Sequence, residues 1–91
     1  MINKRLKAAC LRANITQEKL GIAAGIDEKS ARARVSQYEN GTHQPTFETM
    51  CAFSKVLNIP ECYFYIVDDD FSNAVLAIHQ ILVNHRYVPE N

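Results

Sequence analysis

Hydrophobic side chains recur at spacings of three and four residues along most of this chain, which is the pattern of amphipathic α-helices. Nowhere do four or more residues alternate between apolar and polar, as a half-buried strand would require. Helix-stopping and turn-forming residues interrupt the pattern at short intervals, at Asn14, at Gly25 and in the segments 41–45, 58–60 and 68–70. The pattern therefore predicts an all-α fold of about six helices.

The first predicted helix covers about Asn3 to Ala13 and has one apolar stripe, formed by Leu6, Ala9, Cys10 and Ala13. Its basic residues lie mostly off that stripe: Lys4, Arg5, Lys7 and Arg12. Asn14 suits the left-handed conformation in which a helix often ends.

The second predicted helix is capped by Thr16, runs to Ala24 with Leu20 and Ala24 facing inward, and is closed by Gly25. Gly21 lies inside it, where glycine costs about 1 kcal/mol relative to alanine. Such a residue is tolerable where another backbone approaches closely. Gly21 therefore predicts a helix crossing.

The third predicted helix lies between Ile26 and Gly41, and its apolar face is set by Ala31, Val35 and Tyr38. At 100° per residue, the opposite direction belongs to Ser30, Ala33, Gln37 and Asn40, with Ser36 and the long arms of Arg32 and Arg34 at the flanks. The outward face of this helix is thus short, polar and basic.

Three further helices follow. Pro45 and Thr46 start the fourth, whose predicted inward stripe is Phe47, Met50, Phe53, Ser54 and Leu57 and whose stop is Asn58. Pro60 opens a short fifth helix that ends near Tyr65. Asp70 or Ser72 is expected to cap a sixth, strongly amphipathic helix with apolar residues at Phe71, Ala74, Val75, Ile78, Ile81 and Leu82.

Composition narrows the class of protein. With 91 residues and 47% hydrophobic content, the chain is expected to form one compact globular domain. Its longest apolar run, Cys62 to Val67, is far too short to span a bilayer, and no secretory signal follows the basic start, so we expect a cytoplasmic protein.

Metal and catalytic chemistry find no support in the sequence. The cysteines have no Cys-x-x-Cys spacing, and His43, His79 and His85 have no ligand-like spacing, which predicts no metal and no cofactor. We read the acidic run 68–70 as a cap and linker, and the aromatic run 63–65 as core or dimer contact. No nucleophile and base can be paired from sequence, so no enzyme is predicted.

The zero net charge conceals a segregation. Residues 1–45 hold eight basic and four acidic side chains, whereas residues 46–91 hold two basic and six acidic ones. A basic N-terminal half suggests contact with a polyanion, although chance clustering in a short chain would give the same result.

Four separated motifs carry a family resemblance: the run Thr16 to Leu20, then Ala24-Gly25-Ile26, then Val35 to Gly41, then Pro45 to Met50. Together they resemble the Xre or Cro/repressor-like helix-turn-helix family over roughly residues 3–66. The resemblance implies a lambda-repressor-like DNA-binding domain of five helices, here over residues 1–67, followed by a C-terminal amphipathic helix and short tail over residues 68–91.

The resemblance also implies roles for single residues. Arg32, Ala33, Ser36 and Gln37 match the base-reading positions of the recognition helix. Gln17 matches a position that touches a phosphate at a helix N-terminus, and the loop with Asn40, Thr42 and His43 matches one that grips phosphate on the far side. Lys29 and Arg34 are expected to contact the DNA backbone as well.

This chain departs from the family pattern in two places. Eight residues separate Ile26 from Val35 where the family usually has four, so the extra residues either extend the recognition helix by one turn or enlarge the turn before it; Asp27-Glu28 at a helix start favours the extension. Cys10 stands where the family commonly has an arginine paired with the residue matched by Glu39, and Arg12 or Arg5 would have to replace that arginine.

The function predicted from sequence is that of a bacterial or phage transcriptional regulator, most simply a repressor, that binds double-stranded DNA as a homodimer. One recognition helix buries too little surface for useful specificity alone, and such domains bind two half-sites as two-fold dimers. The expected interface is Phe71, Val75, Ile78, Ile81 and Leu82, unless the last helix folds back onto its own domain. The main alternative is an antitoxin-like or adaptor protein whose acidic C-terminal half binds a protein partner.

Overall fold

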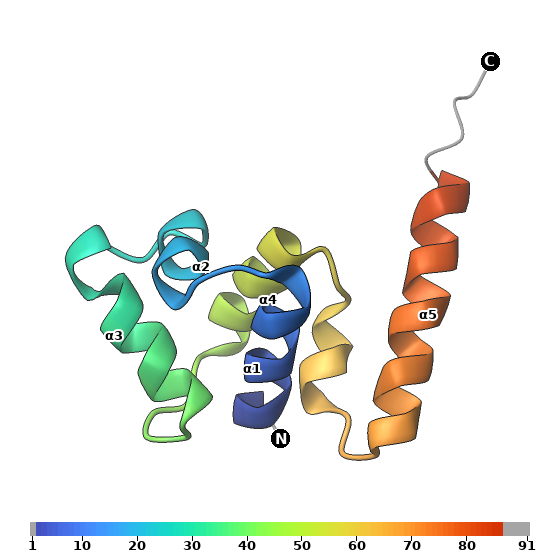
Figure 1. Cartoon of the computed structure of the whole chain (residues 1–91), viewed down its shortest axis with the longest axis horizontal. Coiled ribbons are helices and arrows are strands. Elements are labelled where there is room, and N and C mark those ends of the chain that lie inside the picture. The colour runs from blue at the N-terminus through green and yellow to red at the C-terminus, as the bar shows by residue number, and fades with distance from the viewer. Residues whose placement is uncertain (1, 87–91) are drawn as a thin grey trace.

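The computed structural model describes residues 2–86, which contain only helices and no strand (Figure 1). Five α-helices and one short 3₁₀ helix follow one another along the chain, so the predicted all-α fold is confirmed. Their bounds are α1 (Ile2–Ala13), α2 (Gln17–Ala23), α3 (Glu28–Glu39), α4 (Phe47–Leu57), η1 (Glu61–Tyr65) and α5 (Asp69–Arg86).

The helix boundaries follow local side-chain chemistry, much as predicted. The hydroxyl of Thr16 accepts a hydrogen bond from the amide of Lys19 at 3.1 Å and so caps α2, and Thr46 caps α4 in the same way. Asn14 and Asn58 adopt positive φ values of 54° and 55° after α1 and α4, respectively. Asparagine tolerates this left-handed conformation, which ends a helix by turning the chain away from its axis.

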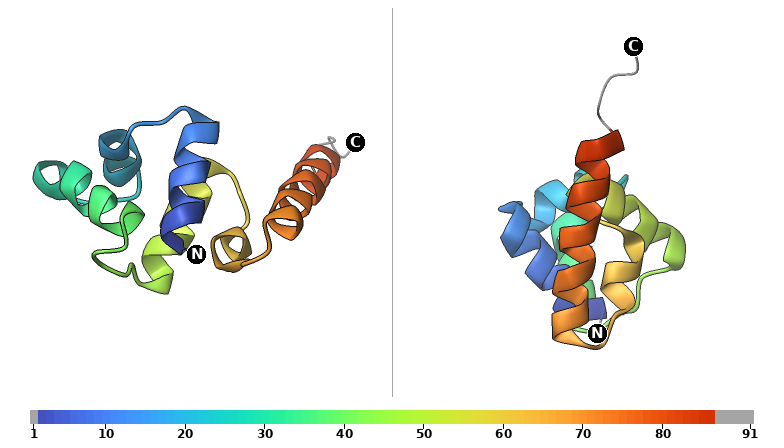
Figure 2. Two further views of the ribbon diagram at one scale, coloured as in Figure 1. Left: turned by 60° about the horizontal axis from the view of Figure 1, so that its bottom comes forward. Right: turned by 90° about the vertical axis from the view of Figure 1, so that its right-hand side faces the viewer.

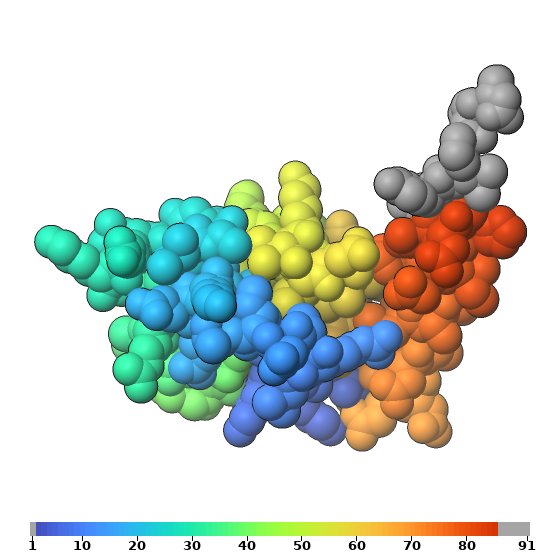
Figure 3. Space-filling view, turned by 45° about the horizontal axis from the view of Figure 1, so that its top comes forward, coloured from blue at the N-terminus to red at the C-terminus, as the bar shows by residue number. Residues whose placement is uncertain are grey.

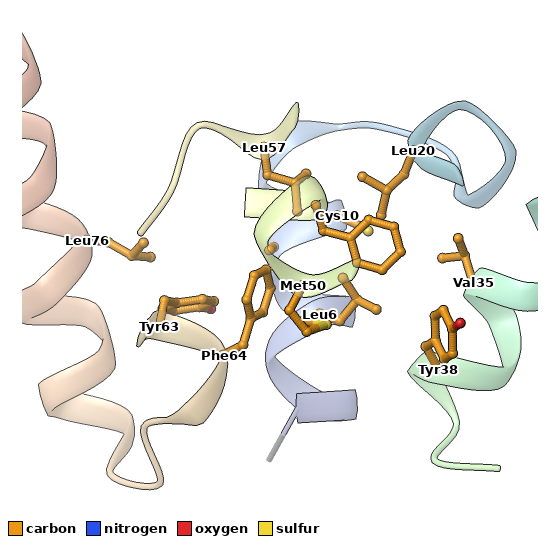
Figure 4. Packing of buried hydrophobic residues seen from close by; sticks show 12 residues of the cluster. Leu6, Cys10, Leu20, Val35, Tyr38, Met50, Leu57, Tyr63, Phe64 and Leu76 are labelled. Atoms are coloured by element: carbon orange, nitrogen blue, oxygen red, sulfur yellow. The ribbon is translucent and has the colours of Figure 1, made fainter. Parts of the chain in front are cut away.

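The core lies where α1, α2, α3, α4 and η1 meet (Figure 4). Six of its side chains have no exposed surface at all: Leu6, Leu20, Val35, Met50, Phe53 and Phe64. The ring of Tyr38 meets that of Phe53 edge-on, with centroids 6.1 Å apart. Tyr63 and Phe64 of the aromatic run belong to this core, as predicted, whereas Tyr65 is 40% exposed.

Two residues that were predicted to face inward are exposed instead. Phe47 is 58% exposed, because it is the first residue of α4 and lies at the rim of the core, where its ring contacts that of Tyr65 at 6.3 Å. Ala13, at the end of α1, is exposed because it borders a cavity between α1, the end of α4 and α5.

The sequence interpretation also misplaced one charged residue and one cap. Arg5 was expected off the inward stripe but is only 5% exposed, because its guanidinium binds the segment between η1 and α5. The cap of α5 is Asp68, whose carboxylate accepts a hydrogen bond from the amide of Phe71 at 2.8 Å, and not Asp70 or Ser72.

Helices α1 to α4 and η1 form the body of the molecule. Helix α5 lies apart from them, across one end of this body, as two further views show (Figure 2). Between residues 69 and 85 only Ser72 and Leu76 are buried, and Leu76 points toward Tyr63 of η1 (Figure 4). Helix α3 lies at the opposite end of the molecule, whose longest dimension is 44 Å. The fold thus separates its basic helix from its apolar C-terminal helix.

Candidate nucleic-acid interface

Helices α2 and α3 form a helix-turn-helix whose turn is fixed by backbone geometry and a cap. Gly25 has a φ of +97°, which favours glycine, and the next amide, that of Ile26, donates to the carbonyl of Gly21 at 2.9 Å. Asp27 then caps α3 by accepting from the amide of Lys29 at 3.2 Å. The extra residues of this chain therefore lengthen α3 at its N-terminal end, and Lys29 lies on the helix and not in a loop.

The close approach of α3 explains the glycine inside α2. A methyl group placed on Gly21 would lie 2.8 Å from Cβ of Ala31 and 3.1 Å from that residue's carbonyl oxygen. The first distance is shorter than two carbon atoms can sustain, so only glycine allows the two helices to approach this closely. The predicted helix crossing at Gly21 is confirmed, and Ala31 is its other side.

The two faces of α3 differ sharply in exposure. Val35 and Tyr38 are buried in the core, together with Ala31. Around the rest of the helix the side chains meet solvent: Arg32, Ala33 and Arg34 are exposed, while Ser36 and Gln37 are half-buried. In the space-filling view the early turns of α3 project at the end of the molecule opposite α5 (Figure 3). This projecting, polar and basic face is accessible to a groove of DNA.

Two hollows accompany this helix and bring several predicted site residues together. One, of about 300 Å³, is lined by Thr16, Gln17, Glu18 and Arg32, so it joins the start of α2 to the first half of α3. The other, of about 270 Å³, is lined by Arg34, Gln37, Tyr38, His43 and Gln44. Gln44 did not stand out from the sequence; its place one residue beyond His43, in the loop after α3, was the only signal that could have found it.

Gln17 connects the start of α2 to the end of α3. Its side-chain amide donates to the Glu39 carboxylate at 3.1 Å, and the Cys10 thiol also hydrogen-bonds to that carboxylate. Burial, and secondarily Glu39, raises the pKa of the Cys10 thiol to about 12, so the thiol is neutral and donates its hydrogen. An amide and a thiol thus occupy the place of the expected arginine; Arg5 is bound elsewhere.

The loop after α3 is organised by its own short contacts. The side-chain oxygen of Asn40 accepts from the amide of Thr42 at 2.9 Å and also from that residue's hydroxyl. The amide of His43 donates to the carbonyl of Gln37 at 3.3 Å, which holds the loop against the last turn of α3. All three predicted loop residues, Asn40, Thr42 and His43, are exposed, and His43 lines the second hollow.

Two features are absent from residues 2–86. No three histidine, cysteine or acidic side chains in this part of the chain come together as a metal site would require. Nor does any helix within the same residues have the length and apolar character needed to cross a membrane.

Comparison with known proteins agrees with this geometry. The model of a helix-turn-helix family, HTH_3, matches residues 6–64, which is more than half of the chain. The crystal structure of the transcriptional regulator BswR superposes with a TM-score of 0.82 at 39% sequence identity, covering 87% of this chain and 78% of that one. No curated protein matches the sequence. The chain belongs to the Xre/Cro-repressor-like helix-turn-helix family, which places it among DNA-binding regulators and not among enzymes.

Proposed function

We propose that this protein is a sequence-specific transcriptional repressor that binds an operator as a homodimer in the cytoplasm and acts by occupying DNA near a promoter. The observation that carries this proposal is the projecting face of α3, which is polar and basic while its opposite face is buried. A B-DNA major groove admits one such helix. The similarity to BswR, itself a transcriptional regulator, supports the same conclusion.

The exposed middle of α3 supplies groups suited to base edges. Arg32 offers paired donors that match the acceptors of guanine, and Gln37 offers the donor and acceptor that match adenine. Ala33 presents a methyl group suited to the methyl of thymine, and Ser36 can donate or accept. Since all four follow one another around the projecting face, one docking of α3 brings them to the same stretch of groove.

Residues around α3 are suited to the phosphates on both sides of that groove. Gln17 keeps one amide hydrogen beyond the one given to Glu39, and it lies at the N-terminus of α2, where helix amides favour an anion. Lys29 and Arg34 add positive charge along α3. On the far side, the ordered loop offers Asn40, Thr42 and His43.

Helix α5 supplies the proposed dimer contact. Its exposed apolar residues include Phe71 (57%), Ile78 (54%), Ile81 (56%) and Leu82 (48%), and the half-buried Val75 completes the stripe. Phe71, Val75, Ile78 and Leu82 are separated by four, three and four residues, which is the seam spacing of paired helices. A second copy of α5 would cover this seam.

The protomer holds α5 and α3 at the two ends of its longest dimension, which is 44 Å. In a dimer paired at α5, the angle between the two protomers therefore decides how far apart their α3 helices lie. Successive major grooves on one side of DNA are roughly 34 Å apart. The proposed dimer thus requires the two protomers to be inclined so that their α3 ends approach each other.

The DNA-binding proposal is tested by selecting duplexes from a random pool with the purified protein. We expect an inverted repeat, bound with an affinity that falls steeply with salt. Arg32→Ala and Gln37→Ala should each lose about 1–3 kcal/mol of discrimination at one base pair of each half-site. Arg12→Ala is the matched control, because Arg12 lies beside α5 and away from α3. No enriched sequence, or equal losses in the control, would contradict the proposal.

The same preparation tests the dimer and the alternative role. Sedimentation of the free protein should show a dimer, and Ile78→Asp should convert it to a folded monomer because a carboxylate cannot be buried in an apolar seam. A wild-type monomer that enriches no DNA sequence would favour the adaptor role instead, with the exposed face of α5 receiving another protein.

A further inference from the structure

The buried guanidinium of Arg5 joins α1 to the segment that leads into α5. Its Nε donates to the carbonyl of Ile66 at 3.0 Å, and its Nη2 donates to the carbonyl of Val67, also at 3.0 Å. The remaining nitrogen, Nη1, lies 2.9 Å from the carboxylate of Asp69, the first residue of α5. The ring of Tyr63 lies beneath, with its centroid 5.8 Å from Cζ. All three nitrogens of this side chain are therefore used on one short stretch of chain.

Asp69 receives a second cation from α1. Nζ of Lys4 lies 3.1 and 3.3 Å from the two carboxylate oxygens. The neighbouring Asp68 caps the helix, and the hydroxyl of Ser72 donates to the carbonyl of Asp69 at 2.7 Å. The first turn of α5 is thus held by charge and hydrogen bonds from α1, at the side of the helix that faces the body.

The rest of α5 has far less support from the body. After Ser72 and Leu76, no residue up to position 85 is buried, and a cavity of about 150 Å³ separates His79 and Gln80 from Arg12. The charged contacts between α5 and the body are therefore concentrated at its base, where Arg5 and Lys4 meet Asp69.

The direction of α5 has consequences at the far end of the molecule. In a dimer joined at α5, each α3 lies up to 44 Å from the contact between the two α5 helices. A change of about 10° at the base moves α3 by roughly 8 Å, which exceeds two base-pair steps of about 3.4 Å. Half-sites are read in register only when the two recognition helices have a fixed separation.

We propose that Arg5 and Asp69 are positioning residues whose contact sets the direction of α5 and thereby the spacing of half-sites that the dimer accepts. This inference rests on the proposed dimeric function. It assigns a role in operator recognition to two residues that lie outside the DNA-binding face.

The test uses Asp69→Asn, with Asp70→Asn as the matched control, because Asp70 is the next residue, is exposed and carries the same charge. The selected inverted repeat is rebuilt with spacers lengthened or shortened one base pair at a time. Wild-type protein and Asp70→Asn should prefer one spacer sharply. Asp69→Asn should keep its half-site sequence and its dimeric state but lose its spacer preference severalfold. An unchanged spacer profile in Asp69→Asn would overturn the proposal.

A second measurement needs no DNA. Spin labels at Glu28→Cys in α3 and Asn84→Cys in α5 report the distance between the two ends of one protomer, in labelled protein diluted with unlabelled protein. Cys51 and Cys62 are replaced by serine, while Cys10 is buried and unreactive. Asp69→Asn should broaden the distance distribution, and Arg5→Lys should do so as well because lysine cannot bind both carbonyls and the carboxylate.

The two readouts separate the two proposals. Equal distance distributions in Asp69→Asn and Asp70→Asn would overturn the positioning role of Arg5 and Asp69, whatever the protein binds. A broadened distribution for Asp69→Asn in a protein that selects no inverted repeat would support that positioning role and overturn the proposed dimeric operator binding.

Discussion

The body of the molecule, from α1 to η1, and its last helix α5 are held in place by different interactions. Phe53 and Phe64 in the body have no exposed surface and interlock helices from distant parts of the chain. Helix α5 buries only Ser72 and Leu76 between residues 69 and 85, and charged contacts to Asp69 tie down its first turn. Packing therefore fixes α3, the helix proposed to face DNA, whereas polar contacts and, in the proposed dimer, a second chain fix α5.

The largest expected difference between the two regions is in how much the free energy of unfolding falls when a phenylalanine ring is removed. Phe64→Ala should lower the free energy of unfolding by about 3–5 kcal/mol, because it removes a fully buried ring and leaves a cavity in the body. Phe71→Ala removes a ring that is 57% exposed on α5. It should leave the unfolding of the monomer nearly unchanged but weaken dimerisation.

Urea denaturation at low protein concentration measures the first effect, and sedimentation over a range of concentrations measures the second. The low concentration matters because dimerisation itself raises apparent stability by mass action. Similar losses of monomer stability in the two variants would show that α5 is part of the core and would remove the distinction drawn above.

A smaller effect is expected where α2 and α3 cross. Gly21→Ala should destabilise the body by about 1–3 kcal/mol, although alanine is the better helix former, because the new methyl group meets Ala31 at 2.8 Å and must push α3 outward. The double variant Gly21→Ala with Ala31→Gly removes the 2.8 Å contact between the two methyl groups. It should recover part of the loss, because the Cα and carbonyl oxygen of residue 31 stay 3.1 Å from the new methyl group. Denaturation of both variants measures this; a stabilised single variant would contradict the close crossing.

Sequence succeeded where structure depends on residues close together in the chain. The caps Thr16 and Thr46 and the left-handed stops Asn14 and Asn58 act on neighbouring backbone, so their effects follow from residue type and position alone. The buried face of α3 followed from helical periodicity, and a helix crossing at Gly21 followed from the cost of a glycine within a helix.

Sequence failed where contacts join distant residues. The burial of Arg5 depends on carbonyls more than 60 positions away, and Gln17 meets Glu39 at a separation of 22 positions. No periodic pattern carries this information, because both side chains are polar and would equally suit a solvent-exposed face. The direction of α5 belongs to the same group, since the helix was predicted from its apolar stripe but its attachment depends on Arg5.

The smallest effect expected concerns the charge that ties α5 to α1. Hydrogen bonds from Lys4 and then Arg5 hold the pKa of Asp69 below its ordinary value. A carboxyl group with a lowered pKa contributes stability above the pKa it has in the unfolded chain, and that contribution is lost as pH falls through the lowered, folded value. Wild-type protein should therefore be slightly more heat-stable than Asp69→Asn at neutral pH, and the difference should vanish in strong acid. Thermal denaturation across a pH series measures this, with Asp70→Asn as the control for the general effect of removing one charge.

A difference between wild type and Asp69→Asn that persisted unchanged at the lowest pH would mean that the carboxylate contributes nothing as a charge. The attachment of α5 would then depend on the two carbonyl contacts of Arg5 alone.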